Sequence, residues 1–316
     1  MTKVLFSVPI KDHQLMEFKN KFPQVEFIVD KDDSDESLLD LADIWVTYGF
    51  QMKKGRIERT KNLKWIMTYG AGVDKLPAEE IINKDILVTN VSGIHRHAMA
   101  EQVFAYMLAH ARKSSEFNRQ QIQGEWDRDI KPLSLYGKTI GIIGVGAIGQ
   151  EIARKAKAFD MTVLGVRRSG KNVEFVDEMY SMEGLSKLLE KSDYIVMILP
   201  LTSETRYILD RAAFEKMKEG SYFVNIARGE VVDTEALLWA LKEKKISGAG
   251  LDVFEEEPLP KDHPLRYMDN VIITPHIAGI FPGYLSRANK IFLHNLDAYL
   301  NNNGEMINIV NMEMGY

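Results

Sequence analysis

Three side chains in the last third of the chain combine the groups needed for acid–base chemistry on an anionic substrate. Arg228, Glu257 and His276 each stand at or just beyond the carboxyl end of an apolar segment. Taken singly, they have ordinary explanations: a surface charge before a helix, one of three solvated glutamates and a loop histidine. Together they supply a guanidinium that anchors an anion, an imidazole that exchanges protons near neutral pH, and a carboxylate that orients the imidazole.

A glycine-rich turn is the strongest local signal in the sequence. The pattern G-x-G-x-x-G is formed by Gly144, Val145, Gly146, Ala147, Ile148 and Gly149. It follows the apolar segment 139–143 and opens a helix with one apolar face, which is the setting that a dinucleotide site requires. Its glycines allow a tight bend, close approach of the backbone to a pyrophosphate and close packing of helix against strand. The pattern predicts dinucleotide binding, with a plain glycine turn as the alternative.

The residues about 20 positions beyond that turn bear on which dinucleotide is bound. NAD-preferring sites carry an acidic side chain there, at the end of the following strand. In this chain Arg167, Arg168 and Ser169 occupy the position. Guanidinium groups pair with phosphate oxygens, so the segment favours the 2′-phosphate of NADP, and NAD is the second candidate. A solvated basic turn is the alternative explanation.

Short β-rich segments alternate with helical patterns and would position these side chains. The expected strands are Val4–Val8, Val25–Val29, Ile44–Thr47, Trp65–Met67, Leu87–Thr89, Thr139–Ile143, Thr162–Val166, Tyr194–Ile198, Tyr222–Asn225, Ser247–Leu251 and Val271–Thr274. Strands that alternate with helices form parallel sheets covered on both faces, a Rossmann-like or flavodoxin-like α/β fold. Ligands collect beyond the carboxyl ends of such strands, where Arg228, Glu257 and His276 stand.

Two long helical patterns mark the passages between two domains. The first, Ala98–Ala111, is apolar on more than one face, which is typical of a helix buried on several sides. The second runs from Leu285 to Tyr299 with apolar residues three and four positions apart. We expect one α/β domain built from residues 1–98 and 287–316. A dinucleotide-binding domain, residues 99–286, would be inserted into it.

The composition excludes several classes of protein. The 316 residues are 45% hydrophobic and 27% charged, with a net charge of −5 and no cysteine. An acidic chain lacks the basic face that nucleic-acid binding needs, and a chain without cysteine fits a reducing compartment. We expect a cytoplasmic protein without targeting segment, membrane span or nucleic-acid partner. The acidic stretch Lys31–Glu36 is expected to be a solvated loop, although it resembles a cation site.

With these motifs in their order and spacing, the chain resembles the D-isomer-specific 2-hydroxyacid dehydrogenases over nearly its full length. The resemblance rests on Gly144–Gly149, Leu199–Thr205, Asn225–Gly229, Leu251–Pro258 and Pro275–Gly279. It implies two α/β domains joined by two helices, a nicotinamide cofactor and a small 2-keto or 2-hydroxy acid as substrate. It also implies a homodimer, for which the apolar helix after residue 98 offers a contact surface. No metal is needed for such a reaction.

The resemblance assigns roles to further residues. It implies that Tyr69, Gly70, Ala71 and Gly72 offer backbone N–H groups to the substrate carboxylate, unless the glycines form only a strand-to-helix turn. Asp252 is similar to the family residue that accepts a hydrogen bond from the nicotinamide carboxamide. The residues implied to line the cofactor groove are Leu199, Pro200, Thr205, Ile226, Ala227 and Gly279.

The expected reaction is the reversible reduction of a 2-keto acid to a D-2-hydroxy acid. His276 would give a proton to the carbonyl oxygen as hydride arrives, Glu257 would hold the imidazole, and Arg228 would bind the carboxylate and carbonyl oxygens. The formate-oxidising relatives carry Gln where this chain has Glu257, so formate oxidation is disfavoured. The alternative is a nucleotide-responsive binding protein of the co-repressor type, without significant turnover.

Two features leave alternatives open. The positions that can face the substrate side chain in such a family are Tyr48, Gly49, Phe50 and Phe281. Their aromatic character suits an apolar or branched keto acid, whereas glyoxylate and hydroxypyruvate also fit. His95 and His97 could suggest a metal site, but side chains two residues apart do not face each other on a helix. We therefore expect a capping or hinge role for this pair.

Overall fold

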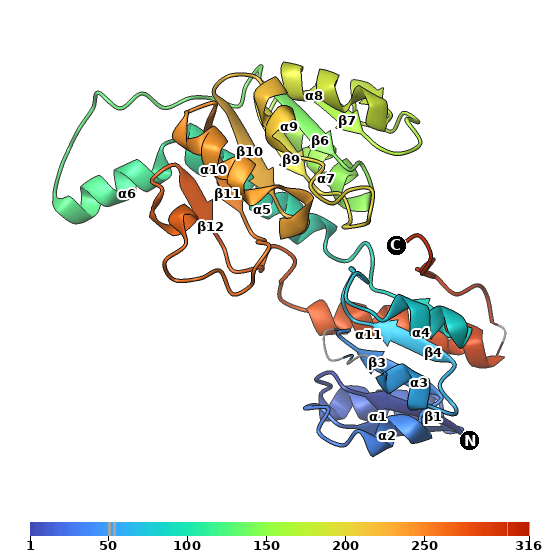
Figure 1. The fold of residues 1–316 in the computed structure, drawn as a ribbon. Coiled ribbons are helices and arrows are strands. Elements are labelled where there is room, and N and C mark those ends of the chain that lie inside the picture. The colour runs from blue at the N-terminus through green and yellow to red at the C-terminus, as the bar shows by residue number, and fades with distance from the viewer. Residues whose placement is uncertain (50–51, 53–54, 302, 316) are drawn as a thin grey trace. The chain divides into compact units, whose positions relative to one another are not determined.

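The computed structural model describes residues 1–49, 52, 55–301 and 303–315 of the chain. They fold into two compact units, each built around a parallel β-sheet (Figure 1). Unit 1 comprises Met1–Ile94 and Phe281–Tyr316, and unit 2 comprises His95–Ile280. Unit 2 is thus an insertion into unit 1. The predicted α/β class, with two parallel sheets, is confirmed.

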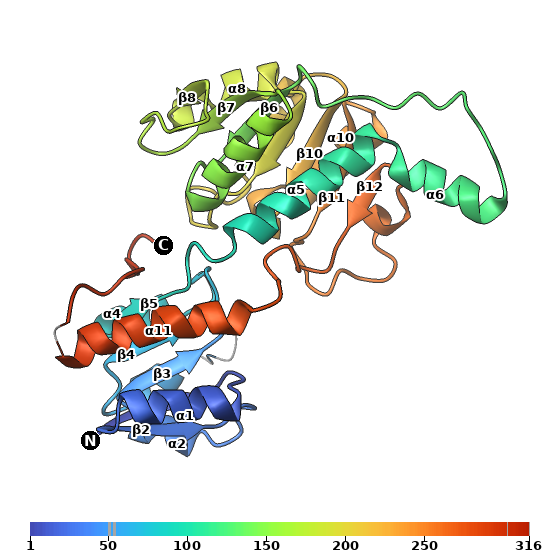
Figure 2. The same ribbon diagram turned by 180° about the vertical axis from the view of Figure 1, so that it is seen from behind.

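Unit 1 is a five-stranded sheet with helices on both faces. Its elements are β1 (Thr2–Phe6), α1 (Asp12–Lys21), β2 (Val25–Val29), α2 (Ser37–Leu41), β3 (Ile44–Thr47), α3 (Arg56–Arg59), β4 (Trp65–Thr68), α4 (Ala78–Asn83), β5 (Leu87–Thr89) and α11 (Tyr284–Asn301). The strand order is β2-β1-β3-β4-β5. Figure 2 shows α1 and α11 over one face, where Phe18 and Phe292 pack against Phe6. The apolar residues of α2, α3 and α4 cover the other face.

Unit 2 is a seven-stranded sheet in the order β12-β11-β10-β9-β6-β7-β8. Its elements are α5 (Arg96–Ala111), α6 (Ser114–Gln123), β6 (Thr139–Ile143), α7 (Ala147–Ala158), β7 (Thr162–Val166), β8 (Glu178–Tyr180), α8 (Leu185–Lys191), β9 (Tyr194–Met197), α9 (Arg211–Lys216), β10 (Ser221–Asn225), α10 (Thr234–Lys242), β11 (Ile246–Leu251) and β12 (Val271–Ile273). Figure 2 shows α5 and α7 over one face of the sheet. The helices α8, α9 and α10 cover the other face.

The central strands are buried on both faces, which explains why continuous apolar segments predicted them. Every residue of β3, β9 and β10 is buried. Neither β8 nor α6 was predicted. The strand β8 is a three-residue edge strand, and α6 is a polar helix without a single buried residue, so neither has the apolar pattern that marks a covered element.

The apolar character of α5 is explained by packing inside unit 2. Its Ala100, Val103, Phe104 and Met107 lie in one core cluster with the residues of β6, β9 and β10. These side chains are buried, so they offer no surface to a second chain. Among the described residues, no helix has both the length and the apolar character to cross a membrane.

An exposed segment follows α5 in unit 2. In Figure 2, α6 and the loop after it lie away from the sheet. Along this segment Ile122 is 78% exposed and Trp126 is 90% exposed. Large apolar side chains that remain in water mark a surface suited to contact with another chain.

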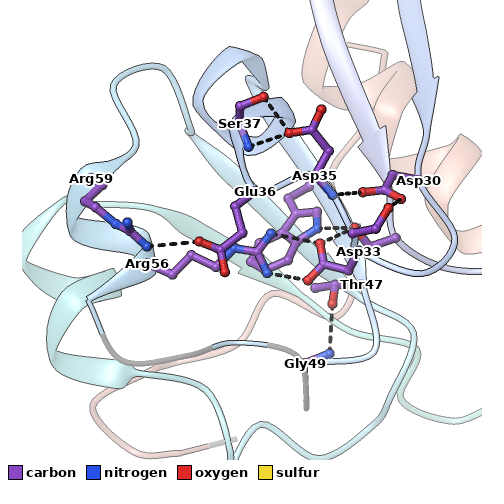
Figure 3. Close-up of polar contacts among 12 residues, drawn as sticks. Asp30, Asp33, Asp35, Glu36, Ser37, Thr47, Gly49, Arg56 and Arg59 are labelled. Atoms are coloured by element: carbon purple, nitrogen blue, oxygen red, sulfur yellow. Dashed lines mark hydrogen bonds and ion pairs between the residues drawn. The ribbon is translucent and has the colours of Figure 1, made fainter.

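The acidic stretch in unit 1 differs from its prediction at one residue. Figure 3 shows the Asp33 carboxylate facing the guanidinium of Arg56, which donates to both of its oxygens, one at 2.8 Å. The two side chains are only 7% and 4% exposed, so the prediction of a solvated loop is wrong for Asp33. Arg56 lies 23 residues away from Asp33 in the sequence. Its guanidinium, rather than a bound cation, neutralises the Asp33 carboxylate of the acidic stretch.

Candidate active site

The glycine-rich turn joins β6 to α7 and depends on glycine at two points. Gly144 has a φ of +110°, and a Cβ there would lie 2.9 Å from the backbone of Ile198. A Cβ on Gly149 would lie 2.5 Å from the Gly144 carbonyl oxygen. Both glycines therefore serve close packing of the turn, and Val145 is buried beneath it.

The start of α7 is open, in contrast to the starts of α9 and α10, which aspartates cap. No atom lies within 4 Å of a Cβ built on Gly146, and Gly146 and Ala147 are exposed while Ile148 is half-buried. The N-cap of α7 carries no side-chain hydrogen bond, whereas Asp233 caps α10 through the N–H groups of two residues. Free N–H groups at a helix start attract an anion such as pyrophosphate.

The basic segment follows β7, the strand beside β6. The register pairs Ile143 with Val166, so the glycine turn and the basic segment leave the sheet at the same edge. Arg167 is half-buried and its N–H donates to the Tyr180 carbonyl at 3.1 Å. Arg168 and Ser169 are exposed. The arrangement suits a phosphate held beside the nucleotide ribose.

The loop after β9 is folded by its own threonine. The Thr205 hydroxyl donates to the Pro200 carbonyl at 2.7 Å and accepts from the Thr202 N–H at 2.8 Å. Pro200 is exposed and Leu199 is half-buried at the sheet edge. The predicted groove residues Ile226 and Ala227 are 2% and 6% exposed and pack in the core. Their contact with a cofactor stays a prediction.

Arg228 follows β10 in a loop that Asn225 fixes. The Asn225 amide donates to the Arg228 carbonyl at 2.9 Å and accepts from the Ala227 N–H at 3.0 Å. A Cβ on Gly229 would lie 1.9 Å from the backbone of Phe254. Only glycine permits this approach, which joins the loop carrying Arg228 to the loop after β11.

Glu257 and His276 form a direct pair. The Nδ1 of His276 lies 2.7 Å from a carboxylate oxygen of Glu257, and the other oxygen accepts from the Phe254 N–H at 3.1 Å. The imidazole is 46% exposed and the carboxylate 30% exposed. With Nδ1 bound to Glu257, the second ring nitrogen, Nε2, is the one suited to exchange a proton with a substrate.

The loop of His276 is held by Asp252, which is 1% exposed. His276 has a φ of +54°, a left-handed conformation that is uncommon outside glycine. The Asp252 carboxylate accepts from the N–H groups of Ile277 at 2.9 Å and Ala278 at 2.8 Å, and from the Thr274 hydroxyl. This use of Asp252 was not apparent from the sequence, and its expected contact with a nicotinamide carboxamide stays a prediction.

The sheet brings the three candidate catalytic residues to one edge of unit 2. The registers pair Asn225 of β10 with Leu251 of β11, and Leu251 with Ile273 of β12. Arg228, Glu257 and His276 follow these three neighbouring strand ends. The structure joins Glu257 to His276 directly, and it joins the loop of Arg228 to that of Glu257 through the glycine contact.

The predicted substrate loop lies in unit 1. Tyr69 is buried, its hydroxyl donates to the Asn289 side chain at 2.6 Å, and its N–H donates to the Thr47 carbonyl at 2.7 Å. The Gly70 N–H donates to the Thr68 hydroxyl at 3.1 Å. These two N–H groups are already used, which narrows the expected donors to Ala71 and Gly72.

The expected substrate-facing residues also belong to unit 1. Tyr48 is half-buried, and burial raises its pKa above the ordinary value. Gly49 is buried with a φ of +88°. Phe281 packs on Tyr284, with ring centres 5.5 Å apart. Phe50 lies outside the described residues.

The paired histidines of the α5 start have separate environments. His97 contacts the Glu151 carboxylate of α7 at 3.1 Å. His95 occupies the N-cap position without a side-chain capping bond, so the capping role is wrong for it, and the hinge role stays a prediction. Burial, followed by the charge of Arg228, lowers the pKa of His95 to about 4, and its ring lies 3.0 Å from a Cβ built on Gly279. Among the described residues, no three His, Asp or Glu side chains gather as a metal site requires.

Comparison with known proteins gives a consistent family. Residues 104–278 match the family described as D-isomer specific 2-hydroxyacid dehydrogenase, NAD binding domain. A glyoxylate reductase of Thermofilum pendens is 40% identical over 79% of this chain and 75% of its own length. A D-isomer specific 2-hydroxyacid dehydrogenase family protein of Aeromonas salmonicida has a TM-score of 0.88 at 33% identity, covering 98% of this chain and 99% of that one.

A longer relative also matches almost the whole chain. D-3-phosphoglycerate dehydrogenase of Methanocaldococcus jannaschii is 36% identical over 99% of this chain. The chain spans 60% of the length of that relative. The match therefore covers only part of the longer protein.

Proposed function

The chain belongs to the D-isomer specific 2-hydroxyacid dehydrogenase family, and on that premise we propose that it interconverts a small 2-keto acid and a D-2-hydroxy acid with a nicotinamide cofactor. The observation that supports this most strongly is the pair of Glu257 and His276 at the sheet edge that also carries the glycine turn. An oriented imidazole beside a dinucleotide site provides what carbonyl reduction needs from a protein.

The residues of unit 2 fit a dinucleotide. The open space over Gly146 and the uncapped start of α7 offer backbone N–H groups to a pyrophosphate. When bound, the nicotinamide supplies the hydride. We propose that unit 2 is the nucleotide-binding domain and unit 1 the substrate domain, in keeping with the expected division near residues 98 and 287.

His276 acts as general acid in the direction of reduction. Negative charge grows on the carbonyl oxygen as hydride reaches the adjacent carbon, and protonated Nε2 donates to that oxygen. Glu257 accepts from Nδ1, which fixes the ring and stabilises the imidazolium. In the reverse direction the neutral imidazole takes the proton from the hydroxyl group.

Arg228 and the loop of unit 1 bind the substrate. The guanidinium binds carboxylate and carbonyl oxygens, which orients the substrate and stabilises charge in the transition state. The backbone N–H groups of Ala71 and Gly72 donate to the carboxylate, since those of Tyr69 and Gly70 are used within unit 1.

NADP is the proposed cofactor, with NAD bound less tightly. Arg167 leaves the sheet beside the glycine turn, and the described residues that follow it, Arg168 and Ser169, bring no carboxylate that would repel a 2′-phosphate. Glyoxylate is the first substrate to examine, because a relative at 40% identity is named glyoxylate reductase.

The functional test is direct. Purified protein is mixed with NADPH or NADH and with glyoxylate, hydroxypyruvate or a branched 2-keto acid, and cofactor oxidation is followed by absorbance. We expect turnover with at least one acid and a higher kcat/KM with NADPH. Tight nucleotide binding without turnover of any acid would replace the proposal with a nucleotide-responsive binding protein. Equal rates with NADH would remove the cofactor preference.

We further propose a homodimer formed through the exposed segment of unit 2 rather than through α5. The residues of α6 are all at least partly exposed, and the Trp126 side chain is exposed to solvent. Light scattering during gel filtration should give twice the mass of the chain, and Trp126→Ser should shift the mass toward the monomer. A monomeric wild type would contradict this assembly.

A further inference from the structure

A buried tyrosine of α5 is hydrogen-bonded toward the candidate active site. Tyr106 is 1% exposed, and its hydroxyl contacts the hydroxyl of Thr274 at the end of β12. The Thr274 hydroxyl in turn contacts the Asp252 carboxylate. The three side chains form one continuous chain of hydrogen bonds between α5 and the loop of His276.

The direction of this chain follows from its acidic end. The Asp252 carboxylate already accepts from two backbone N–H groups, so Thr274 donates to it as well. Because the Thr274 proton is used in that bond, Tyr106 must donate to Thr274. Burial raises the pKa of Tyr106 to about 12, so the phenol keeps the proton it donates.

The sheet is shaped to seat this tyrosine. A Cβ on Gly250 of β11 would lie 2.4 Å from the Tyr106 ring, closer than any real contact. Glycine inside a strand weakens the strand, and here its absence of a side chain admits the ring against the sheet. The tyrosine is therefore fixed by packing as well as by its hydroxyl.

We propose that Tyr106 is a positioning residue for His276, acting through Thr274 and Asp252. The bond from Tyr106 fixes the Thr274 hydroxyl, which helps to hold the Asp252 carboxylate against the N–H groups of Ile277 and Ala278. These contacts flank His276 and keep its backbone at a φ of +54°, which presents Nδ1 to Glu257. The catalytic consequence rests on the proposed function, whereas the effect on ring geometry does not.

The unit offers a matched control for Tyr106. Tyr222 lies in the same core cluster and is 2% exposed, and its hydroxyl has no hydrogen-bond partner among the described residues. Tyr106→Phe and Tyr222→Phe each remove one buried hydroxyl from the same core. Only the first removes a bond of the chain that leads to His276.

The experiment measures kinetics and ring geometry in the full-length protein. Tyr106→Phe should lower kcat about fivefold to tenfold, the change expected for one hydrogen bond, with the Kd for NADPH unchanged. Nitrogen-15 NMR should show a weaker hydrogen bond at His276 Nδ1, the signal being assigned by its loss in His276→Gln. Tyr222→Phe should match the wild type in both measurements.

Thr274 provides a second test that does not depend on the folding of Tyr106→Phe. Thr274→Val should reproduce the loss, Thr274→Ser should restore activity and NMR signal, and Tyr106→Phe should add little to Thr274→Val. An unchanged Nδ1 signal in both Tyr106→Phe and Thr274→Val would overturn the proposal. If the wild type turns over no 2-keto acid, the proposed function fails, and the NMR comparison still decides the positioning role.

Discussion

The two parallel sheets end in charged pairs that differ in their access to water. At the carboxyl edge of unit 1, the side chains of Asp33 and Arg56 are 7% and 4% exposed. At the carboxyl edge of unit 2, those of Glu257 and His276 are 30% and 46% exposed. The same α/β architecture therefore carries a closed ion pair in one unit and an accessible acid–base pair in the other.

The neighbours of the unit 1 pair explain the difference. Arg56 lies over the Trp45 ring, with the guanidinium carbon 4.9 Å from the ring centre. The Trp45 indole N–H donates to Ser7 at 2.9 Å, and Ser7 donates to Asp33 at 3.1 Å. Hydrogen bonds pair both terminal nitrogens of Arg56 with Asp33, while its Nε has no hydrogen-bond partner among the described residues. We assign the cluster to stability. In unit 2 the Nδ1 of His276 contacts Glu257, and nearly half of the imidazole remains exposed to water.

The largest effect should come from the accessible pair. His276→Ala should lower kcat by about a hundredfold to ten-thousandfold, because general acid–base catalysis is lost. Steady-state kinetics with NADPH and the best 2-keto acid measure the change, and the Kd for NADPH should stay within twofold. His13→Ala, at an exposed position of unit 1, serves as the control. A variant at His276 that keeps more than a tenth of the wild-type rate would contradict the assigned role.

The closed pair should affect stability instead. Asp33→Asn leaves the buried Arg56 charge without a carboxylate and should lower the free energy of unfolding by about 3 kcal/mol. Asp33 has a φ of +50°, which asparagine also tolerates, so backbone strain does not confuse the comparison. Urea denaturation, followed by the fluorescence of the adjacent Trp45, measures the loss.

The exposed counterpart of that pair is its control. Arg59 and Glu36 form an ion pair whose side chains are 67% and 46% exposed. Glu36→Gln should change stability by less than about 1 kcal/mol, because water screens the pair. Equal losses in Asp33→Asn and Glu36→Gln would remove the distinction drawn between closed and exposed pairs.

The dependence of stability on pH tests the buried imidazole of His95 in unit 2. Burial, then the charge of Arg228, lowers the pKa of His95 from 6.5 to about 4 in the folded chain. Between these two pH values His95 is protonated in the unfolded chain and neutral in the folded chain. The contribution of neutral His95 to the free energy of unfolding is therefore complete above pH 6.5 and is lost as pH falls toward 4. The loss should be about 3 kcal/mol, measured by urea denaturation at successive pH values. His95→Gln should flatten the curve, and His13→Gln should leave it unchanged.

The smallest effect is expected at Arg167, which follows β7 at the carboxyl edge of the unit 2 sheet. Arg167→Asp should reduce the preference for NADPH over NADH about tenfold, because a carboxylate repels the 2′-phosphate and the guanidinium is lost. The ratio of kcat/KM values for the two cofactors measures the change. Lys242→Asp, at an exposed position on α10, makes the same charge change elsewhere in unit 2. An unchanged ratio in Arg167→Asp would show that the basic segment does not select the cofactor.

Sequence alone located the strands because burial on both faces demands continuous apolar residues. The strands β2, β3, β5, β6 and β7 have the predicted bounds, while β1 begins and ends two residues early. The edge strand β8 and the polar helix α6 carry no such signal and were not predicted. The pattern of apolar residues thus predicts strands that are buried, and it misses exposed elements such as β8 and α6.

Within the site, sequence indicated which residue types stand at strand ends, and the Glu257–His276 contact fits that expectation. It did not indicate the chain from Tyr106 to Thr274, since the two residues are 168 positions apart. The burial of Asp33 by Arg56 was hidden for the same reason. Gly250 inside a buried strand was the one local sign that another group approaches the sheet closely.

The exposed segment of unit 2 contains Trp126, whose intrinsic fluorescence can report whether this surface is covered. Of the four tryptophans, Trp45 and Trp65 are fully buried, Trp239 is half-buried and Trp126 is 90% exposed. Indole emission moves to shorter wavelength when the ring leaves water. Association through this surface would therefore appear as a concentration-dependent blue shift in an unlabelled sample, and the shift would vanish when Trp126 is replaced.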